Sequence, residues 1–147
     1  MKFIDSEHEK FYFETINETK KSDVYYRALI YTLGICELTR EHFNEIFDIK
    51  NGEINFDSII AGWQTGTSAK VTRMAFSLWN SNSMYDSEED CKNNKISCYY
   101  NPSEIFCCSY APYFYEGVKI RYPEYTIERN YYEIEDLDNE DNEMEQL

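Results

Sequence analysis

The stretch that most constrains the fold spans residues 62–80, GWQTGTSAKVTRMAFSLWN. Glycines flank its Trp-Gln-Thr segment, which predicts a tight turn because glycine tolerates positive φ and close backbone approach. Thr67 and Ser68 supply hydroxyls that can cap a following helix. Apolar residues then recur at helical spacing: Val71, Met74, Ala75, Leu78 and Trp79. The stretch therefore predicts a turn followed by an amphipathic helix, around which the rest of the chain is organised.

The first turns of this helix carry two cations, Lys70 and Arg73, although the helix dipole favours acids there. The turn and these cations have two possible roles. In the first, the amides of residues 67–69 and one of the cations form an anion site. In the second, the turn is purely structural and Trp63 anchors it to the core. A P-loop is excluded, because Lys followed by Ser or Thr does not come directly after Gly66. We favour the structural turn.

Further helices are indicated by their end signals. Ser6 and Glu9 have the spacing of a capping box and predict a helix over 7–20. We expect this helix to bury Phe11, Phe13 and Ile16. The other expected helices cover residues 23–33, 40–47, 103–106 and 113–121, with ends marked by Gly34, Thr39, Pro112 and Pro123. Asn51-Gly52 is typical of a type I′ turn and predicts a small β-hairpin. The fold class is therefore mainly α, a single compact domain of about five helices.

The chain of 147 residues has 28 acidic and 14 basic side chains, a net charge of −14. Residues 126–147 hold nine acids and one base, and few of them are apolar towards the end. We therefore expect a helical domain over 1–125 and an acidic, disordered tail over 126–147. This charge argues against direct nucleic-acid binding and suits a partner with a basic surface. Acidity that serves only solubility is the alternative.

Catalytic and metal-binding residue types are present, but their spacing is not that of a known catalytic motif. His8 and His42 are the only histidines, and we expect both on helix surfaces. No acid–base pair follows from the sequence, so we predict no enzymatic activity. Four cysteines fall within 18 residues: Cys91, Cys98, Cys107 and Cys108. They predict a zinc site, with free thiols as the alternative because the usual C-x2–4-C spacing is missing. One of the adjacent pair should pack against the core.

No apolar run approaches the ~20 residues that span a bilayer, and the first residues lack the apolar core of a signal peptide. We therefore expect a cytoplasmic protein with no membrane contact. Its cysteines would then be thiols or metal ligands rather than disulfides.

Two stretches, GWQTGTSAKVTRMAFSLWN (62–80) and EIFCCSYAPYFYEGVKIRYPEY (104–125), resemble a family of small, functionally uncharacterised proteins of Firmicutes and their phages and mobile elements. FIDSEHEKFYFE and DVYYRALIYTLGI fit the same pattern, so the resemblance covers roughly residues 3–125. It implies no catalytic residues. It implies a setting in which short accessory proteins often inhibit host defence, as type II-A anti-CRISPR proteins do, a step that rests on analogy.

The leading functional hypothesis is a non-enzymatic inhibitor in the host cytoplasm that binds a basic surface of a nucleic-acid-handling defence protein. Cas9 is the best single candidate, since acidic side chains can occupy a channel built for phosphates and block loading. We expect aromatic anchors among Tyr99, Tyr100, Tyr110, Tyr131 and Tyr132. We also expect the folded body, residues 1–125, rather than the tail to be the effector. The alternatives are a zinc-binding structural or regulatory protein and a small metal-dependent enzyme.

Overall fold

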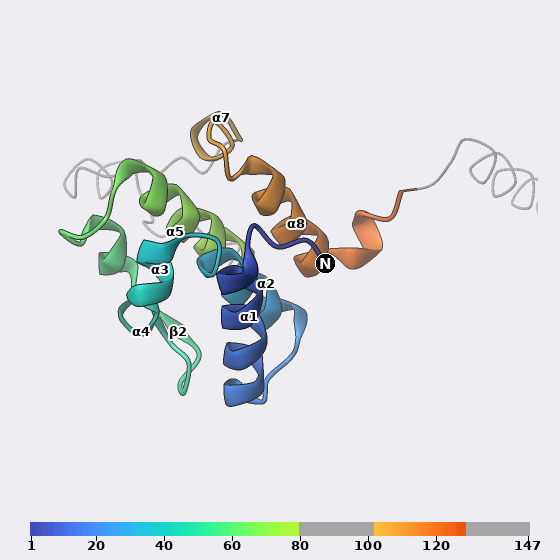
Figure 1. Ribbon diagram of the computed structural model, residues 1–147, viewed down its shortest axis with the longest axis horizontal. Helices are drawn as coiled ribbons and strands as arrows, with labels where there is room; N and C mark the ends of the chain where they lie inside the picture. The colour runs from blue at the N-terminus through green and yellow to red at the C-terminus, as the bar shows by residue number, and fades with distance from the viewer. Residues whose placement is uncertain (80–101, 129–147) are drawn as a thin grey trace, which may run out of the picture.

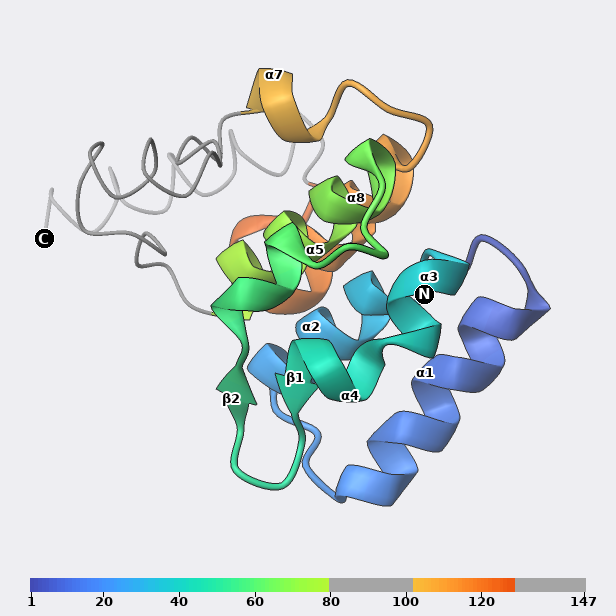
Figure 2. The same ribbon diagram turned by 90° about the vertical axis from the view of Figure 1, so that its left-hand side faces the viewer.

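Helix α2 (Val24–Leu33) lies at the centre of the computed structural model, which describes residues 1–79 and 102–128. It packs on α1 (Ser6–Thr19), α5 (Gly66–Trp79) and α8 (Ala111–Arg121), as Figures 1 and 2 show. Residues 28–33 of α2 are all buried, which a helix can accommodate only when neighbours cover every side of it. The prediction of a mainly helical fold is confirmed.

Shorter elements complete the described body. They are α3 (Glu37–Glu41), α4 (Phe43–Ile46), β1 (Phe47–Asp48), β2 (Glu53–Ile54), the 3₁₀ helix η1 (Phe56–Ile60), α7 (Pro102–Ile105) and the 3₁₀ helix η2 (Pro123–Tyr125). In Figure 2, α3, α4 and the hairpin lie beside α2, while α7 lies beyond α5. Helix α8 packs on both α2 and α5. Among the described residues, none of the helices is both long and apolar enough to cross a membrane.

Both ends of α2 are capped by side chains. The carboxylate of Asp23 accepts hydrogen bonds from the amides of Tyr25 and Tyr26, and Gly34 ends the helix as predicted. Its last carbonyls have no partner within the helix and are bound from outside. His8 Nε2 lies 2.7 Å from Tyr31 O, Thr39 Oγ1 lies 2.5 Å from Leu33 O, and Arg40 Nη1 lies 2.8 Å from Gly34 O. Side chains from α1 and α3 thus supply hydrogen bonds to carbonyl oxygens at the C-terminal end of α2.

Helix α1 differs from the prediction in its cap and in its buried face. The N-cap is Asp5 rather than Ser6, because Asp5 Oδ1 accepts the His8 amide at 2.8 Å. The face turned to the core carries His8, Tyr12 and Thr15, whereas Phe13 is 54% exposed. Phe11 and Ile16, also predicted to be buried, are partly buried against the core. The contact between His8 and the end of α2 sets this rotation of α1.

The segment after α2 was predicted as one helix over 40–47 capped by Thr39, and this is wrong. The structure has two short helices, α3 and α4, that break at His42. Thr39 lies inside α3, where its buried hydroxyl binds the carbonyl oxygens of Leu33 and Cys36 instead of capping a helix. The large apolar residues of this segment are buried: Phe43, Ile46 and Phe47.

The predicted hairpin exists, but its turn is of another kind. β1 and β2 pair antiparallel, with Phe47 opposite Ile54 and Asp48 opposite Glu53. Four residues, 49–52, connect the strands, and only Gly52 has positive φ, at 67°. A type I′ turn requires positive φ at both central residues, so that prediction is wrong. The Asp48 carboxylate instead organises the loop by accepting the amides of residues 50 and 51.

The helices near the C-terminus begin close to the positions that the prolines predict. Pro112 occupies the first turn of α8, and Pro123 begins η2 after α8 has ended. Arg121 Nε donates to Leu78 O at 2.9 Å, which fastens the end of α8 to the end of α5. The predicted tail, 126–147, lies outside the described residues from residue 129 onward.

Candidate functional site

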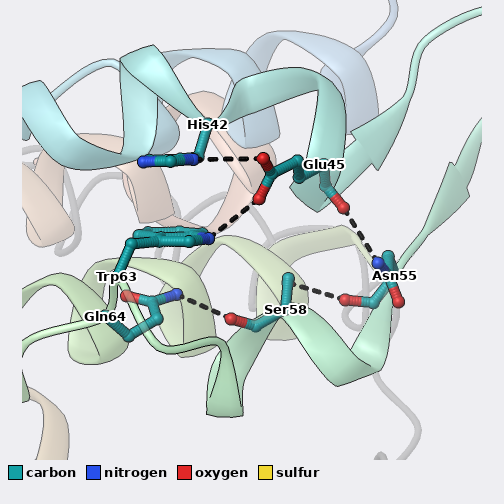
Figure 3. Close-up of polar contacts among 6 residues, drawn as sticks. All are labelled: His42, Glu45, Asn55, Ser58, Trp63 and Gln64. Carbon is teal, nitrogen blue, oxygen red and sulfur yellow. Dashed lines mark hydrogen bonds and ion pairs between the residues drawn. The ribbon is translucent and has the colours of Figure 1, made fainter.

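The Trp63 turn is fastened to α4 through a stacked pair of rings (Figure 3). The indole of Trp63 lies parallel to the imidazole of His42, with centroids 4.1 Å apart and planes 4° apart. Trp63 Nε1 donates to Glu45 Oε2 at 2.9 Å, and His42 Nδ1 lies 3.3 Å from Glu45 Oε1. One carboxylate therefore holds both rings, and the arrangement is that of the structural turn that we favoured.

The glycines of this turn are not needed for its shape. Neither Gly62 nor Gly66 has positive φ, and a β-carbon on either would meet no atom within 4 Å. The cap of α5 also differs from the prediction. Thr65 Oγ1 accepts the Ser68 amide at 3.0 Å, and Ser68 Oγ accepts the Thr65 amide at 2.8 Å. This reciprocal capping box makes Thr65 the N-cap, in place of Thr67 or Ser68.

The alternative to the structural turn, an anion site, has few free donors. Of the amides of residues 67–69, those of Ser68 and Ala69 are bound by the hydroxyl and carbonyl oxygens of Thr65. Lys70 Nζ donates to Cys107 O at 3.2 Å. Arg73 has a buried Nε without a hydrogen-bond partner in the described part of the chain. The occupied amides therefore favour the structural turn over an anion site.

Further polar contacts in Figure 3 join the hairpin, η1 and the turn. Asn55 Nδ2 donates to Glu45 O at 3.0 Å, Ser58 Oγ to Asn55 O at 2.6 Å, and Gln64 Nε2 to Ser58 O at 3.1 Å. The Ser58 hydroxyl thus donates to a carbonyl oxygen rather than to a histidine, so this pair does not have the geometry of an activated nucleophile. The cluster positions the turn.

His8 was expected on a surface and is fully buried instead. Its Nδ1 lies 3.2 Å from the amide nitrogen of Ile4, and its Nε2 binds Tyr31 O. Burial lowers the pKa of His8 below its ordinary value of 6.5, more than the Tyr31 carbonyl and the Asp5 carboxylate raise it. The sequence signal was the spacing of His8, Tyr12 and Thr15, which share one helix face.

Two of the four predicted zinc ligands, Cys91 and Cys98, lie outside the described residues. Cys107 is exposed, whereas Cys108 packs against the core with its Sγ 3.6 Å from Ile105 O. The expectation that one of the adjacent pair faces the core is confirmed. Within residues 1–79 and 102–128, no three His, Cys, Asp or Glu side chains form a group that could hold a metal ion. The zinc site stays a prediction.

The described residues place one predicted aromatic anchor. Tyr110 is partly buried and packs on Phe114, with ring centroids 6.5 Å apart, so most of its surface is used inside the protein. The other four anchors, Tyr99, Tyr100, Tyr131 and Tyr132, fall outside those residues.

An exposed aromatic anchor occurs instead on α1. We define the outer face of α1 by seven of its exposed residues: Glu7, Glu9, Lys10, Phe13, Glu14, Asn17 and Glu18. This face carries four carboxylates and one ammonium group, and Glu9 and Lys10 lie one turn before Phe13. Its ring is supported from below by Tyr12 and Phe3, at centroid distances of 5.2 and 5.8 Å. The run of three aromatics, 11–13, was the signal for it, because a helix cannot turn three consecutive residues to one side.

An open groove of about 290 Å³ extends this face towards α3. Its lining comprises Glu7, Lys10, Phe11 and Glu14 of α1 together with Arg40 and Glu41 of α3. Arg40 donates from Nη1 to Gly34 O and keeps its charge, so the groove lining carries three carboxylates and two cations. The groove and the outer face of α1 therefore form one continuous, mainly acidic surface.

Comparisons with known proteins place the chain in a family without assigning an activity. No curated protein matches it, and no solved structure matches it. A family of unknown function, DUF6075, matches residues 1–134, which includes every described element from α1 to η2. Because this match covers nearly the whole sequence, the chain belongs to the DUF6075 family.

Proposed function

We propose that the protein is a non-enzymatic inhibitor that uses the outer face of α1 to bind a basic, nucleic-acid-binding surface of a defence protein, with Cas9 as the first candidate partner. The setting of phages and mobile elements is part of this proposal. The observation that carries it is Phe13, a 54% exposed ring on the mainly acidic outer face of α1.

The surroundings of Phe13 suit a contact surface. Protein interfaces commonly combine an aromatic anchor with a polar rim, and a few such anchors carry most of the binding energy. Phe3 and Tyr12 already hold the ring, so little side-chain entropy remains to be lost on binding. Covering the exposed part of Phe13 contributes roughly 1–2 kcal/mol. An anchor held in advance therefore favours binding by the folded body.

The charges on the outer face of α1 indicate the kind of partner. Glu7, Glu9, Glu14 and Glu18 face solvent with only Lys10 of opposite sign on the same helix face. Carboxylates in this number repel nucleic acid and attract Lys- and Arg-rich surfaces. A surface built to hold phosphates is basic, so a bound acidic helix covers it and excludes its nucleic acid. Inhibition then needs no chemical step.

The proposal is tested with purified Cas9 by measuring binding kinetics at several salt concentrations and cleavage of a DNA target. Phe13→Ala should weaken binding at least tenfold, mainly through faster dissociation, and should relieve inhibition. The double variant Glu9→Gln with Glu14→Gln should slow association and flatten the salt dependence, because these charges steer the encounter.

Ile60→Ala is the matched control, since Ile60 is 51% exposed on η1, outside the outer face of α1. It should bind within about twofold of the wild-type chain, as expected for a side chain outside the contact. Absence of binding to Cas9 at low salt would eliminate Cas9 as the partner. Wild-type affinity of the Phe13→Ala variant for its partner would eliminate α1 as the contact.

A further inference from the structure

We propose that His8 is a pH-sensitive latch: its neutral ring holds residues 1–5, the N-terminal strap, against the body, and protonation of Nδ1 releases the strap. Release uncovers the aromatic cluster formed by Tyr12 and Tyr31. The latch concerns the free protein, so it stands whether or not α1 binds a basic partner.

His8 binds the middle of the strap through both its ring and its backbone amide. Ile4 donates its amide to His8 Nδ1 at 3.2 Å, and Asp5 accepts the His8 amide at 2.8 Å. The Phe3 ring lies 5.1 Å from the imidazole, edge to face. The Phe3 ring also packs on Tyr12, Phe13 and Tyr31, with ring centroids 5.7, 5.8 and 5.8 Å away. Closer to the chain end, Lys2 O accepts the hydroxyl of Tyr31 and the Lys2 amide reaches Glu116 Oε1 at 3.4 Å.

The hydrogen-bond pattern fixes the tautomer of His8. A backbone amide can only donate, so Nδ1 must accept from Ile4 and carries no proton. Nε2 therefore carries the proton and donates it to Tyr31 O, a carbonyl that the end of α2 leaves unbound. A second proton on Nδ1 would face the Ile4 amide donor to donor. The hydrogen bond between the ring and the Ile4 amide is lost, while the hydrogen bond between the ring and α2 is kept.

The charged and titratable groups around His8 affect its protonation less than its burial does. Asp5 of the strap favours the charged ring, and Arg40 of α3 opposes it. Burial raises the pKa values of Tyr12 and Tyr31 above their ordinary value of 10, so both phenols stay neutral at physiological pH. Desolvation of the imidazole by burial is the largest influence. Only release of the strap gives the ring the water that a charge requires.

The direction of the pH effect follows from linkage. The pKa of His8 is lowered while the strap is closed, and it returns towards 6.5 when the ring meets water. The open form therefore binds more protons than the closed form below pH 6.5, and closure is favoured above it. Between pH 7.5 and pH 5 the open population should rise by up to about 30-fold.

Amide hydrogen exchange and ¹⁵N NMR of the full chain test the latch. At pH 7.5, the ring nitrogens of His8 should show a protonated Nε2 and a bare Nδ1. The protection factor of the Ile4 amide should fall at least tenfold by pH 5, with a midpoint that follows the titration of His8. Amides of α5 should keep their protection. His8→Gln should abolish the pH dependence at Ile4, while the control His42→Gln should preserve it.

Three results would overturn the latch. They are protonation of His8 with unchanged protection at Ile4, a fall at Ile4 that persists in His8→Gln, and a simultaneous loss in α5, which would report global unfolding. If His8→Gln does not fold, the wild-type titration decides alone. The midpoint at Ile4 must then follow the ring signals of His8 and not those of His42.

Discussion

Gly117 of α8 and Thr32 of α2 lie so close that a β-carbon at position 117 would meet the Thr32 hydroxyl oxygen at 2.8 Å. The same β-carbon would lie 3.1 Å from Leu78 Cδ1 of α5. The glycine thus lets α8 approach α2 and α5 together, where the three helices meet. The Thr32 hydroxyl is buried without a hydrogen-bond partner in the described part of the chain. No hydrogen bond to another described residue therefore holds this hydroxyl in another position, away from α8.

We expect Gly117→Ala to destabilise the protein, because overpacking costs about 1–3 kcal/mol and exceeds the helix preference of alanine, about 1 kcal/mol. Urea unfolding measures the change. Gly66→Ala is the control, since its β-carbon meets no atom, and it should unfold at the wild-type midpoint or above. Adding Thr32→Ala to Gly117→Ala should recover part of the loss as a coupling energy. Wild-type stability of Gly117→Ala would contradict the close approach.

The capping box of α5 gives a second prediction. Thr65→Ala should lower the free energy of unfolding by about 1 kcal/mol, because the Ser68 amide loses its acceptor. Thr67→Ala should change it by no more than about 0.5 kcal/mol, since Thr67 is exposed and the cap lies two residues earlier. Thermal unfolding of both variants distinguishes them. A larger loss for Thr67→Ala would assign the cap to Thr67.

The thiols should react in the order of their exposure. Cys107 is exposed and should react with a thiol reagent in the native protein, whereas buried Cys36 should react only after unfolding. Cys36→Ser and Cys107→Ser identify the two signals. Zinc at the four predicted cysteines would shield Cys107 until a chelator is added, and the metal would appear in elemental analysis. Two results together would contradict the zinc prediction. Cys107 would react with the thiol reagent at the same rate with and without chelator, and elemental analysis would find no zinc in the protein.

The sequence marked only some helix ends correctly. Gly34 ends α2 and Pro112 lies in the first turn of α8, because glycine and proline restrict the backbone within one turn. The capping hydroxyls were misplaced, since several neighbouring residues can serve: Asp5 caps α1 in place of Ser6, and Thr65 caps α5. The face of α1 could not be found this way. Hydrophobicity ranks Phe13 above His8 and Thr15, but the rotation of α1 depends on a contact between residues 8 and 31. The buried face of α1 is set by contacts between residues distant in sequence, which the local hydrophobic pattern does not reveal.

The same limit applies to the candidate site. The sequence singled out the Trp63 turn, and the structure shows its ring bound by Glu45, 18 residues away. The acidic character of the protein was evident from its composition. The exposure of Phe13 was not, because it follows from three consecutive aromatics of which only Tyr12 turns fully to the core. A surface anchor of this kind is recognised once the buried face of its helix is known.

The position of α8 against α2 has a consequence for synthesis. Helix α2 ends at residue 33, but the helix that covers its last exposed side ends at residue 121. At about 5–20 residues per second, roughly 4–18 seconds pass between the translation of the two. During that interval residues 28–33, of which all but Thr32 are apolar, are not fully covered, and apolar surface exposed in this way favours aggregation until α8 has been made.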